Sequence, residues 1–504
     1  MAVSSGAFEA ESISLEEALQ RCDSRGHHAR KVLIVSCAAC MCGGMSGAVG
    51  PFLMTPIPTE GNYTTWATSL LASSTFAGMW AGSVLGGLAC DAIGPGRVMT
   101  GSLVLLTIGG AAPIYSPSIA IAARTLCGIA LCSVYQAANT YVAEWVATSR
   151  RSTYLSMLHV WIAVGGVVTT LLAVALQTQQ AGYRVLLGIN STPPLLVLVL
   201  TFRFVSLSEA PRWLLVTGAP GTCDKMLRRI ARSGGGLAMT DAAGGHGGGS
   251  SDDDALPTLP KIVPSIEAAP SAEGSGVGLP STRTANSDDS GAPPAAASRR
   301  FTPRARCIEL LALWRLHAFG MALSFCLNFG SKGSEIWVGK YVEAKGLASI
   351  SRVIYLCTAF GKICGDILNM RVSRRLGRLR CLQIGFGACA LTTFGFVMPM
   401  PTGASAVWLL SLAFLQGVGM DLLWCNLYIY LVERFPTTVR STGFGVAMGL
   451  GRAGGVISSA LGNLMPSMDV AFIGYGVSFL VGLLVALRPA VETARRSLVD
   501  SGAA

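Results

Sequence analysis

The stretch Tyr430-Leu-Val-Glu-Arg-Phe-Pro-Thr-Thr-Val-Arg440 closes a long apolar segment and places an arginine seven residues after a glutamate. The same spacing occurs earlier in the chain, where Arg151 follows Glu144, at an offset of 433 − 144 = 289 residues. A short basic loop also occurs twice, and its glycines, Gly94 and Gly377, are 377 − 94 = 283 residues apart. Two independent pairs at nearly one offset indicate that the chain consists of two homologous halves.

The sequence around these signatures is too apolar for a soluble protein. Hydrophobic residues make up 51% of the chain, charged residues 13%, and the mean hydropathy is +0.53. Soluble domains carry about 25% charged residues, so the few charges here cannot cover a soluble surface. On a soluble protein a net charge of +11 would suggest a nucleic-acid partner. Here the charged residues are too few to form a basic surface. We therefore expect a lipid bilayer as the surroundings and no nucleic-acid partner.

Twelve stretches are long enough to cross a membrane, which takes about 20 mostly apolar residues. They must be helices, because lipid cannot satisfy the open edge of a sheet. The prediction is an all-α integral membrane protein with twelve transmembrane helices in two pseudo-symmetric six-helix halves. The expected spans are 32–54, 67–89, 98–115, 118–143, 153–176, 184–206, 310–330, 349–370, 381–400, 404–431, 441–463 and 469–488.

The spans divide the chain into five parts. The segment 234–300 is rich in Gly, Ser, Ala, Pro and Asp. Such a composition cannot bury enough apolar surface to fold, so the linker around it is expected to be largely disordered. The parts are an N-terminal segment 1–31, a first half 32–208, a linker 209–306, a second half 307–488 and a tail 489–504.

The distribution of Lys and Arg predicts the orientation. One set of short loops carries Arg97, the run 371–380 and Arg440, whereas the opposite loops carry far fewer basic residues. By the positive-inside rule the first set is cytoplasmic, so both termini and the linker are expected in the cytoplasm. The glycosylation sequon Asn62-Tyr-Thr64 then falls in an outward loop. The sequence predicts a multi-pass protein of the plasma membrane or an internal membrane.

Four short motifs lie in the spans or close to their ends. They are Gly87–Arg97 with its G-x-x-x-D-x-x-G pattern, Ser208–Leu215 (SEAPRWLL), Tyr430–Arg440 and Gly451–Gly455 (GRAGG). Together they resemble motifs of the major facilitator superfamily, in particular its organic cation/anion, synaptic-vesicle and aromatic-acid carriers, and more distantly its sugar porters. The resemblance covers nearly all of the chain except its ends and the linker.

The resemblance implies a carrier that moves a small solute by alternating access. It places Arg452 where organic-anion carriers have arginine and cation carriers have aspartate. Sugar porters have a Gln-Gln pair in their seventh transmembrane helix. In the corresponding span of this chain, residues 323–331 read LSFCLNFGS. We therefore favour a secondary transporter of a small organic anion. A sugar or organic-cation transporter of the same fold, and a non-transporting membrane sensor, are the alternatives.

Ionisable side chains inside spans are costly and by default mark a solute pathway. Arg452 carries a fork suited to a carboxylate, and Asp421 is the candidate carrier of a coupling proton. Lys362 and Asp366 are one turn apart and could instead neutralise each other, which is the structural alternative. The substrate-binding candidates are Arg452, Asp421, Lys362, Tyr135, Asn139, Trp161, Trp424 and Tyr428.

Charged residues at the cytoplasmic helix ends are candidates for a conformational switch. Carboxylates and guanidiniums can pair across the two halves and separate in alternation. The alternative is that they are topology anchors in solvent, where ion pairs contribute little. The repeated spacing favours the switch. The switch candidates are Asp91, Arg97, Glu144, Arg151, Glu209, Arg212, Glu433 and Arg440.

Other functional classes find little support. No nucleotide-binding motif is present, which disfavours a primary pump, and no catalytic constellation suggests an enzyme. The CxxC of Cys37 and Cys40 lies within a span without a second pair, and His159 and His317 have no ligand-spaced partner. We expect no cofactor and no metal. The expected partners are a small-molecule solute, the lipid bilayer, and protons or another coupling ion, with the protein itself a monomer.

Overall fold

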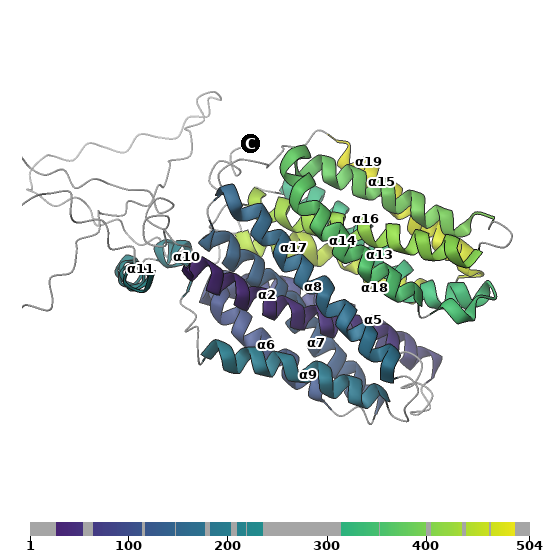
Figure 1. Cartoon of the computed structure of the whole chain (residues 1–504), viewed down its shortest axis with the longest axis horizontal. Coiled ribbons are helices and arrows are strands. Elements are labelled where there is room, and N and C mark those ends of the chain that lie inside the picture. The colour runs from purple at the N-terminus through teal and green to yellow at the C-terminus, as the bar shows by residue number, and fades with distance from the viewer. Residues whose placement is uncertain are drawn as a thin grey trace, which may run out of the picture.

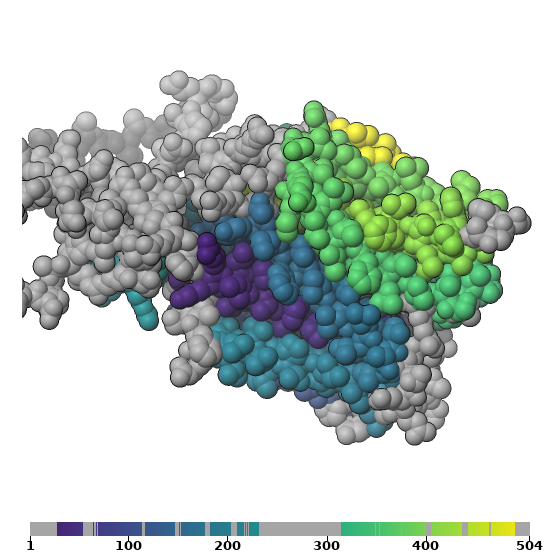
Figure 2. Space-filling model, viewed as in Figure 1, coloured from purple at the N-terminus to yellow at the C-terminus, as the bar shows by residue number. Residues whose placement is uncertain are grey.

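The structure is a computed structural model that describes residues 27–53, 64–112, 116–146, 148–176, 182–202, 209–217, 219–234, 314–351, 353–399, 405–435, 440–462 and 465–488. These residues form helices and no strand. The long helices make two bundles, one coloured purple to teal and the other green to yellow (Figure 1). Figure 2 shows the two bundles packed against each other along a seam.

Each bundle corresponds to one of the halves predicted from the repeat. The helices of the first half are α2 (His27–Ala48), α3 (Gly50–Leu53), α5 (Thr65–Ile93), α6 (Pro95–Ala111), α7 (Pro117–Trp145), α8 (Thr148–Leu176) and α9 (Gly182–Leu200). Those of the second half are α13 (Trp314–Ala344), the 3₁₀ turn η2 (Ala348–Ile350), α14 (Val353–Leu376), α15 (Arg378–Val397), α16 (Ser405–Arg434), α17 (Arg440–Gly451), α18 (Ala453–Leu461) and α19 (Met468–Ala486).

The twelve-helix prediction is confirmed, six spans to each half, with α17 and α18 together forming one. Within the described residues, ten helical stretches are long and apolar enough to cross a membrane by themselves. The two further positions are filled by α6, which has only 17 residues, and by α13. The expected end of helix 7 at residue 330 is wrong, because α13 continues to Ala344 and carries charged side chains inside the bundle.

The internal repeat is visible in the packing of the helices. α5 and α7 approach closely at Gly78 and Gly128, where an added Cβ would lie 2.1 Å from a backbone carbonyl oxygen of the facing helix. α14 and α16 do the same at Gly361 and Gly417, with 2.2 Å for the corresponding distances. The offsets are 361 − 78 = 283 and 417 − 128 = 289, the two values found in the sequence motifs. Helix pairs at equivalent places in the two halves therefore use the same contact, which small residues permit.

The two basic loops also share one backbone turn. Gly94 joins α5 to α6 with φ of +97°, and Gly377 joins α14 to α15 with φ of +90°. Residues with a Cβ rarely adopt such angles, so glycine is required at both places. The loop repeat that the sequence predicts is thus a repeat of conformation.

The predicted linker begins with ordered structure. α10 (Pro211–Val216) and α11 (Pro220–Gly234) follow the first half, and Figure 1 shows them at the end of its bundle. The indole N–H of Trp213 donates to the carbonyl oxygen of Asp91 at 3.2 Å, which ties α10 to the end of α5. The rest of the expected linker and the tail lie outside the described residues, as do residues 1–26 and Asn62 of the sequon.

Candidate functional site

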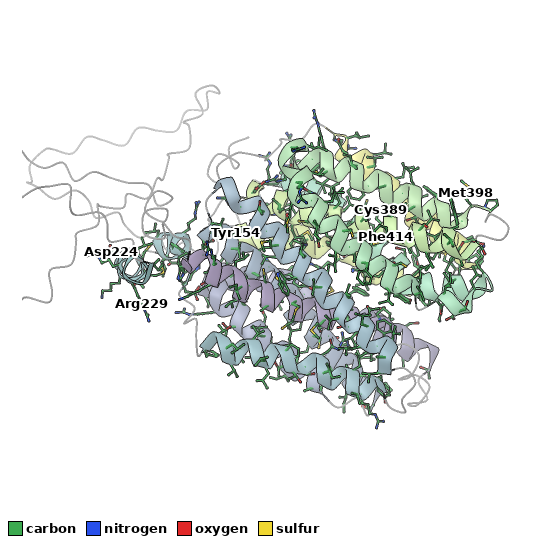
Figure 3. All side chains as sticks on the ribbon, viewed as in Figure 1. Tyr154, Asp224, Arg229, Cys389, Met398 and Phe414 are labelled. Carbon is green, nitrogen blue, oxygen red and sulfur yellow. The ribbon has the colours of Figure 1, made fainter. Side chains whose placement is uncertain are left out.

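The two ends of the bundle differ in charge. We call the end that carries Asp91, Arg97, Arg378 and the α10–α11 pair the basic end. In Figure 3 Asp224 and Arg229 of α11 mark this end, and Met398, which follows α15, marks the opposite end. The sequence-predicted switch residues belong to the basic end, whereas the charged residues of the spans lie between the two ends.

A cavity of about 210 Å³ lies between the two halves. Its wall comes from α2, α3, α5, α7 and α8 of the first half and from α13, α14, α16 and Arg452 of the second. The cavity is therefore formed by the seam between the bundles, where a change in their relative position alters its access. Six of the eight predicted substrate-binding residues line it: Tyr135, Lys362, Asp421, Trp424, Tyr428 and Arg452.

Two lysines share one carboxylate at the wall of this cavity. Lys332 Nζ lies 2.8 Å from Glu335 Oε2, and Lys362 Nζ donates to Glu335 Oε1. Asp421 interacts electrostatically with both lysines, so two cations and two carboxylates compensate one another. Within the described residues Lys362 and Asp366 form no hydrogen bond or close ion pair, although their charges interact, because Glu335 from α13 reaches Lys362 instead.

Two arginines at the cavity have no such compensation. The Nη2 of Arg452 donates to the Tyr428 hydroxyl at 2.7 Å, and Arg124 donates to the carbonyl oxygen of Ser46 at 3.0 Å and to the hydroxyl of Thr75 at 3.4 Å. Each arginine is only 3% exposed, and within the described residues neither has a carboxylate partner. Buried guanidiniums with neutral partners favour binding of an anion.

Two predicted residues lie away from the cavity. Asn139 is fully buried and donates to the carbonyl oxygen of Tyr135 within α7, which makes it part of helix packing. Trp161 on α8 is 39% exposed and does not line the cavity. A single aromatic residue does not indicate from sequence which face of a span it occupies, and here the tryptophan lies outside the cavity lining.

Among the described residues, hydrogen bonds between Asp91 and Thr442 join the two halves at the basic end. Asp91 Oδ2, at the end of α5, accepts from the backbone N–H of Thr442 at 2.9 Å and from its hydroxyl at 2.5 Å. Thr442 belongs to α17, so this carboxylate joins the first half to the second. A switch that uses Asp91 would separate these groups when the basic end opens.

Glu209 binds the basic loop of its own half. Its carboxylate accepts from the backbone N–H groups of Gly96 at 3.3 Å and Arg97 at 3.2 Å, and lies 3.6 Å from Arg97 Nε. Burial raises the pKa of the Glu209 carboxyl above its usual value, although these donors act in the opposite direction. Since the Arg97 side chain is 66% exposed, the ion pair itself contributes little.

The buried ion pair of the second half joins α15 to α16. Arg378 donates from Nη2 to Glu433 Oε1 at 3.2 Å and from Nε to Oε2 at 3.3 Å, with both side chains less than a tenth exposed. The pair stays within one half, as does Arg97 with Glu209, so neither of these two pairs joins the halves. Arg378 is the first residue of α15, directly after the Gly377 turn. This turn places it beside Glu433 near the end of α16.

For the other predicted switch residues the structure gives the position and, for three of them, the burial. Glu144 near the end of α7 and Arg151 near the start of α8 are both buried. Arg212 is half-buried in the first turn of α10. Arg440 begins α17, and its side chain lies outside the described residues.

Sequence reasoning missed Lys332 and Glu335. Both follow the expected end of helix 7, where falling hydropathy suggests a loop. The signal that could have found them is their own spacing, since opposite charges at i and i+3 face one another on a helix and can enter a bundle as a pair.

Comparisons with known proteins agree with this architecture. The cis,cis-muconate transport protein of Acinetobacter baylyi is 25% identical over 86% of this chain and 88% of its own length. The organic cation/carnitine transporter 7 of Arabidopsis thaliana is 25% identical over 86% and 85%. The solved structure of the proton:xylose symporter XylE bound to 6-bromo-6-deoxy-D-glucose has the same fold, with a TM-score of 0.69 at 15% identity over 94% of this chain and 98% of the other. The profile of the Major Facilitator Superfamily matches residues 33–459 and 357–500, and the chain belongs to that family.

Proposed function

We propose that this protein is a secondary transporter of small organic anions that works by alternating access. The observation that carries the proposal is the charge of the cavity between the halves. Its lining includes four cationic side chains, Arg124, Lys332, Lys362 and Arg452, but only two carboxylates, Glu335 and Asp421. The formal excess of two positive charges (4 − 2) is matched by a dicarboxylate.

The kind of cation supports this solute class further. Arg452 and Arg124 keep their charge under all conditions and offer planar forks that fit carboxylates, whereas the lysines are held by Glu335. The similar muconate transport protein is named for a dicarboxylate. An organic cation is a poorer fit, since the carboxylates Glu335 and Asp421 are already compensated by lysines. A neutral sugar would leave both arginines uncompensated.

The orientation follows from the same distribution of charge. We place the basic end, with both termini and the linker, in the cytoplasm, because loops rich in arginine are retained there. Opening at the basic end would release the contact of Asp91 with Thr442 and expose the cavity to the cytoplasm. The functional unit in this proposal is the monomer, since one chain supplies the entire cavity wall.

Uptake into proteoliposomes tests the proposal. The purified full chain is reconstituted and offered radiolabelled mono- and dicarboxylates, carnitine and xylose, with and without a pH gradient. We expect saturable uptake of a dicarboxylate in preference to the other solutes. Preference for carnitine or xylose would assign the chain to the cation or sugar alternative, and ligand binding without flux would make it a sensor.

Asp421 is the residue we propose for proton coupling. It lies in the cavity beside Lys362, where gain or loss of its proton changes the charge that the solute meets. We expect Asp421→Asn to reduce anion accumulation driven by a pH gradient to the level seen without a gradient, while exchange of labelled for unlabelled anion continues. Asp469→Asn is the matched control, because Asp469 pairs with Lys345 outside the cavity. Gradient-driven accumulation that survives Asp421→Asn would remove Asp421 as the coupling residue.

A further inference from the structure

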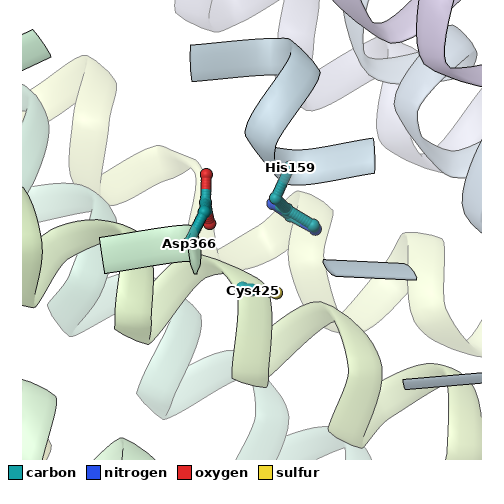
Figure 4. Close-up of side chains that lie close together, drawn as sticks. All are labelled: His159, Asp366 and Cys425. Atoms are coloured by element: carbon teal, nitrogen blue, oxygen red, sulfur yellow. The ribbon is translucent and has the colours of Figure 1, made fainter. Parts of the chain in front are cut away.

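Three side chains of the kinds that bind transition metals meet at the edge of the cavity, whose lining includes one of them, His159. His159 comes from α8, Asp366 from α14 and Cys425 from α16. One imidazole nitrogen, one carboxylate oxygen and the sulfur all lie within 4.8 Å of one another, and Figure 4 shows the three side chains grouped at this point. The residues are 207 and 59 positions apart in the chain, so no local spacing reveals the group. His159 thus has no partner at ligand spacing in the sequence, as expected, and the fold brings Asp366 and Cys425 to it from distant helices.

The group is buried, and two of its members lack hydrogen-bond partners. Asp366 is fully buried, and neither of its carboxylate oxygens has a hydrogen-bond partner in the described part of the chain. The same holds for Nε2 of His159, which is 6% exposed. Lys362, one turn before Asp366, is occupied by Glu335. A buried polar group without a partner is costly, so an occupant that satisfies both groups at once is expected.

The donor set identifies the class of occupant. One imidazole, one carboxylate and one thiolate are the ligands that Zn²⁺ accepts, and three protein ligands leave a fourth position for water. Zinc bonds of about 2.0–2.3 Å place tetrahedral ligand atoms roughly 3.3–3.8 Å apart, so modest side-chain movements close the site. Carboxylate and thiolate together cancel the charge of a divalent cation, which suits a site as buried as this one. Alkaline-earth cations prefer all-oxygen sites, and the sulfur disfavours them.

The surroundings of Cys425 support its role as a ligand. The side-chain N–H of Asn369 donates to the sulfur at 2.9 Å, and the hydroxyl of Ser156 lies 3.4 Å from it. The side-chain N–H of Asn369 also donates to the Ser156 hydroxyl, and its side-chain oxygen accepts from the side-chain N–H of Asn426. Because Ser156 belongs to α8 and the two asparagines to α14 and α16, these hydrogen bonds cross the seam. Such outer contacts orient ligand atoms and stabilise a thiolate.

We propose that His159, Asp366 and Cys425 form a Zn²⁺ site that joins the two halves of the protein. His159 belongs to the first half, whereas Asp366 and Cys425 belong to the second. A bound ion fixes α8 to α14 and α16 in the arrangement of this structure. Where the proposed transport function holds, Zn²⁺ slows uptake by opposing separation of the halves at the seam.

Binding is tested on the purified full chain in detergent, without any transport assay. Co²⁺ is titrated as a spectroscopic probe, followed by displacement with Zn²⁺. We expect one equivalent per chain, a thiolate-to-Co²⁺ charge-transfer absorption, and loss of that absorption in Cys425→Ser. His159→Gln and Asp366→Asn should weaken binding by roughly 100-fold or more. Loss of a residue that only orients a metal ligand typically costs about 10- to 100-fold, and loss of a ligand itself should cost at least as much. The matched control is Cys389→Ser, a buried cysteine on α15 outside the group, which should bind like the wild type.

Two measurements keep the outcome clear. Zn²⁺ should raise the melting temperature of the wild type and of Cys389→Ser but not of Cys425→Ser, which also shows that each variant is folded. Stoichiometric binding unaffected by all three substitutions would mean an adventitious ion only and would overturn the site, as would the absence of binding. Inhibition of uptake by Zn²⁺ is measured separately. Binding without inhibition would overturn only the effect on transport, while inhibition that persists in Cys425→Ser would come from another site.

Discussion

Arg452→Ala lowers the kcat/KM for uptake of a dicarboxylate by about 100-fold in our expectation. Removing one partner of a buried charge pair costs about 2–5 kcal/mol, and 2.8 kcal/mol is about a factor of 100. Arg452 lines the cavity, is almost fully buried and has the Tyr428 hydroxyl as its hydrogen-bond partner within the described residues. Its guanidinium therefore remains available to a carboxylate. Initial rates of uptake into proteoliposomes over a range of solute concentrations give the measurement.

Two further variants show how much of the lost uptake comes from the bidentate geometry of the Arg452 guanidinium and how much from its charge. Arg452→Lys keeps the charge but loses bidentate geometry, so we expect an intermediate loss, mostly in KM. Arg184→Ala on α9 removes an exposed arginine outside this cavity and should transport like the wild type. If Arg452→Ala carries the dicarboxylate at the wild-type rate, the assignment of this arginine to the anion is wrong.

Gly417→Leu should prevent stable packing of α14 against α16. An added Cβ at Gly417 would lie 2.2 Å from the carbonyl oxygen of Thr358, which is backbone and cannot move aside without displacing its helix. Overpacking of a core commonly costs about 1–3 kcal/mol, and a clash of two helix backbones lies at or above that range. The expected result is a loss of folded protein in size-exclusion chromatography and a lower melting temperature for what remains.

The control for this substitution is Gly101→Leu. Gly101 on α6 has nothing within 4 Å of an added Cβ, so leucine there should leave the melting temperature nearly unchanged. Gly128→Leu should fail like Gly417→Leu, because Gly128 makes the equivalent contact in the first half. Equal stability of Gly101→Leu and Gly417→Leu would contradict the close approach of α14 and α16.

The fold could be predicted from the sequence because its two strongest signals are long-range and simple. Apolar stretches of membrane length predict helices, and the offsets of 283 and 289 residues predict two halves. The glycine contacts at Gly78 and Gly361, and at Gly128 and Gly417, repeat these offsets in three dimensions. What limits the prediction is the end of each helix, as with α13, where paired charges continue a span that hydropathy would close.

The candidate site could be predicted only in part. Arg452, Asp421 and Lys362 stood out because an ionisable residue in a span is rare whatever its surroundings. Which charges compensate one another depends on contacts between helices, so the partnership of Lys362 with Glu335 was not visible. The same reason hides the group of His159, Asp366 and Cys425, whose members come from three helices.

The positive excess of the cavity has a consequence for the electrical behaviour of the carrier. A dianion bound among four cations and two carboxylates gives a site of zero net charge, whereas the empty site keeps two positive charges. Each elementary charge that crosses a membrane potential of 100 mV gains or loses about 2.3 kcal/mol. If dicarboxylates are the solute, the loaded protein with both carboxylates ionised would reorient with little regard to voltage, whereas the empty protein, or a loaded one with a proton on Asp421, would carry net charge through the field.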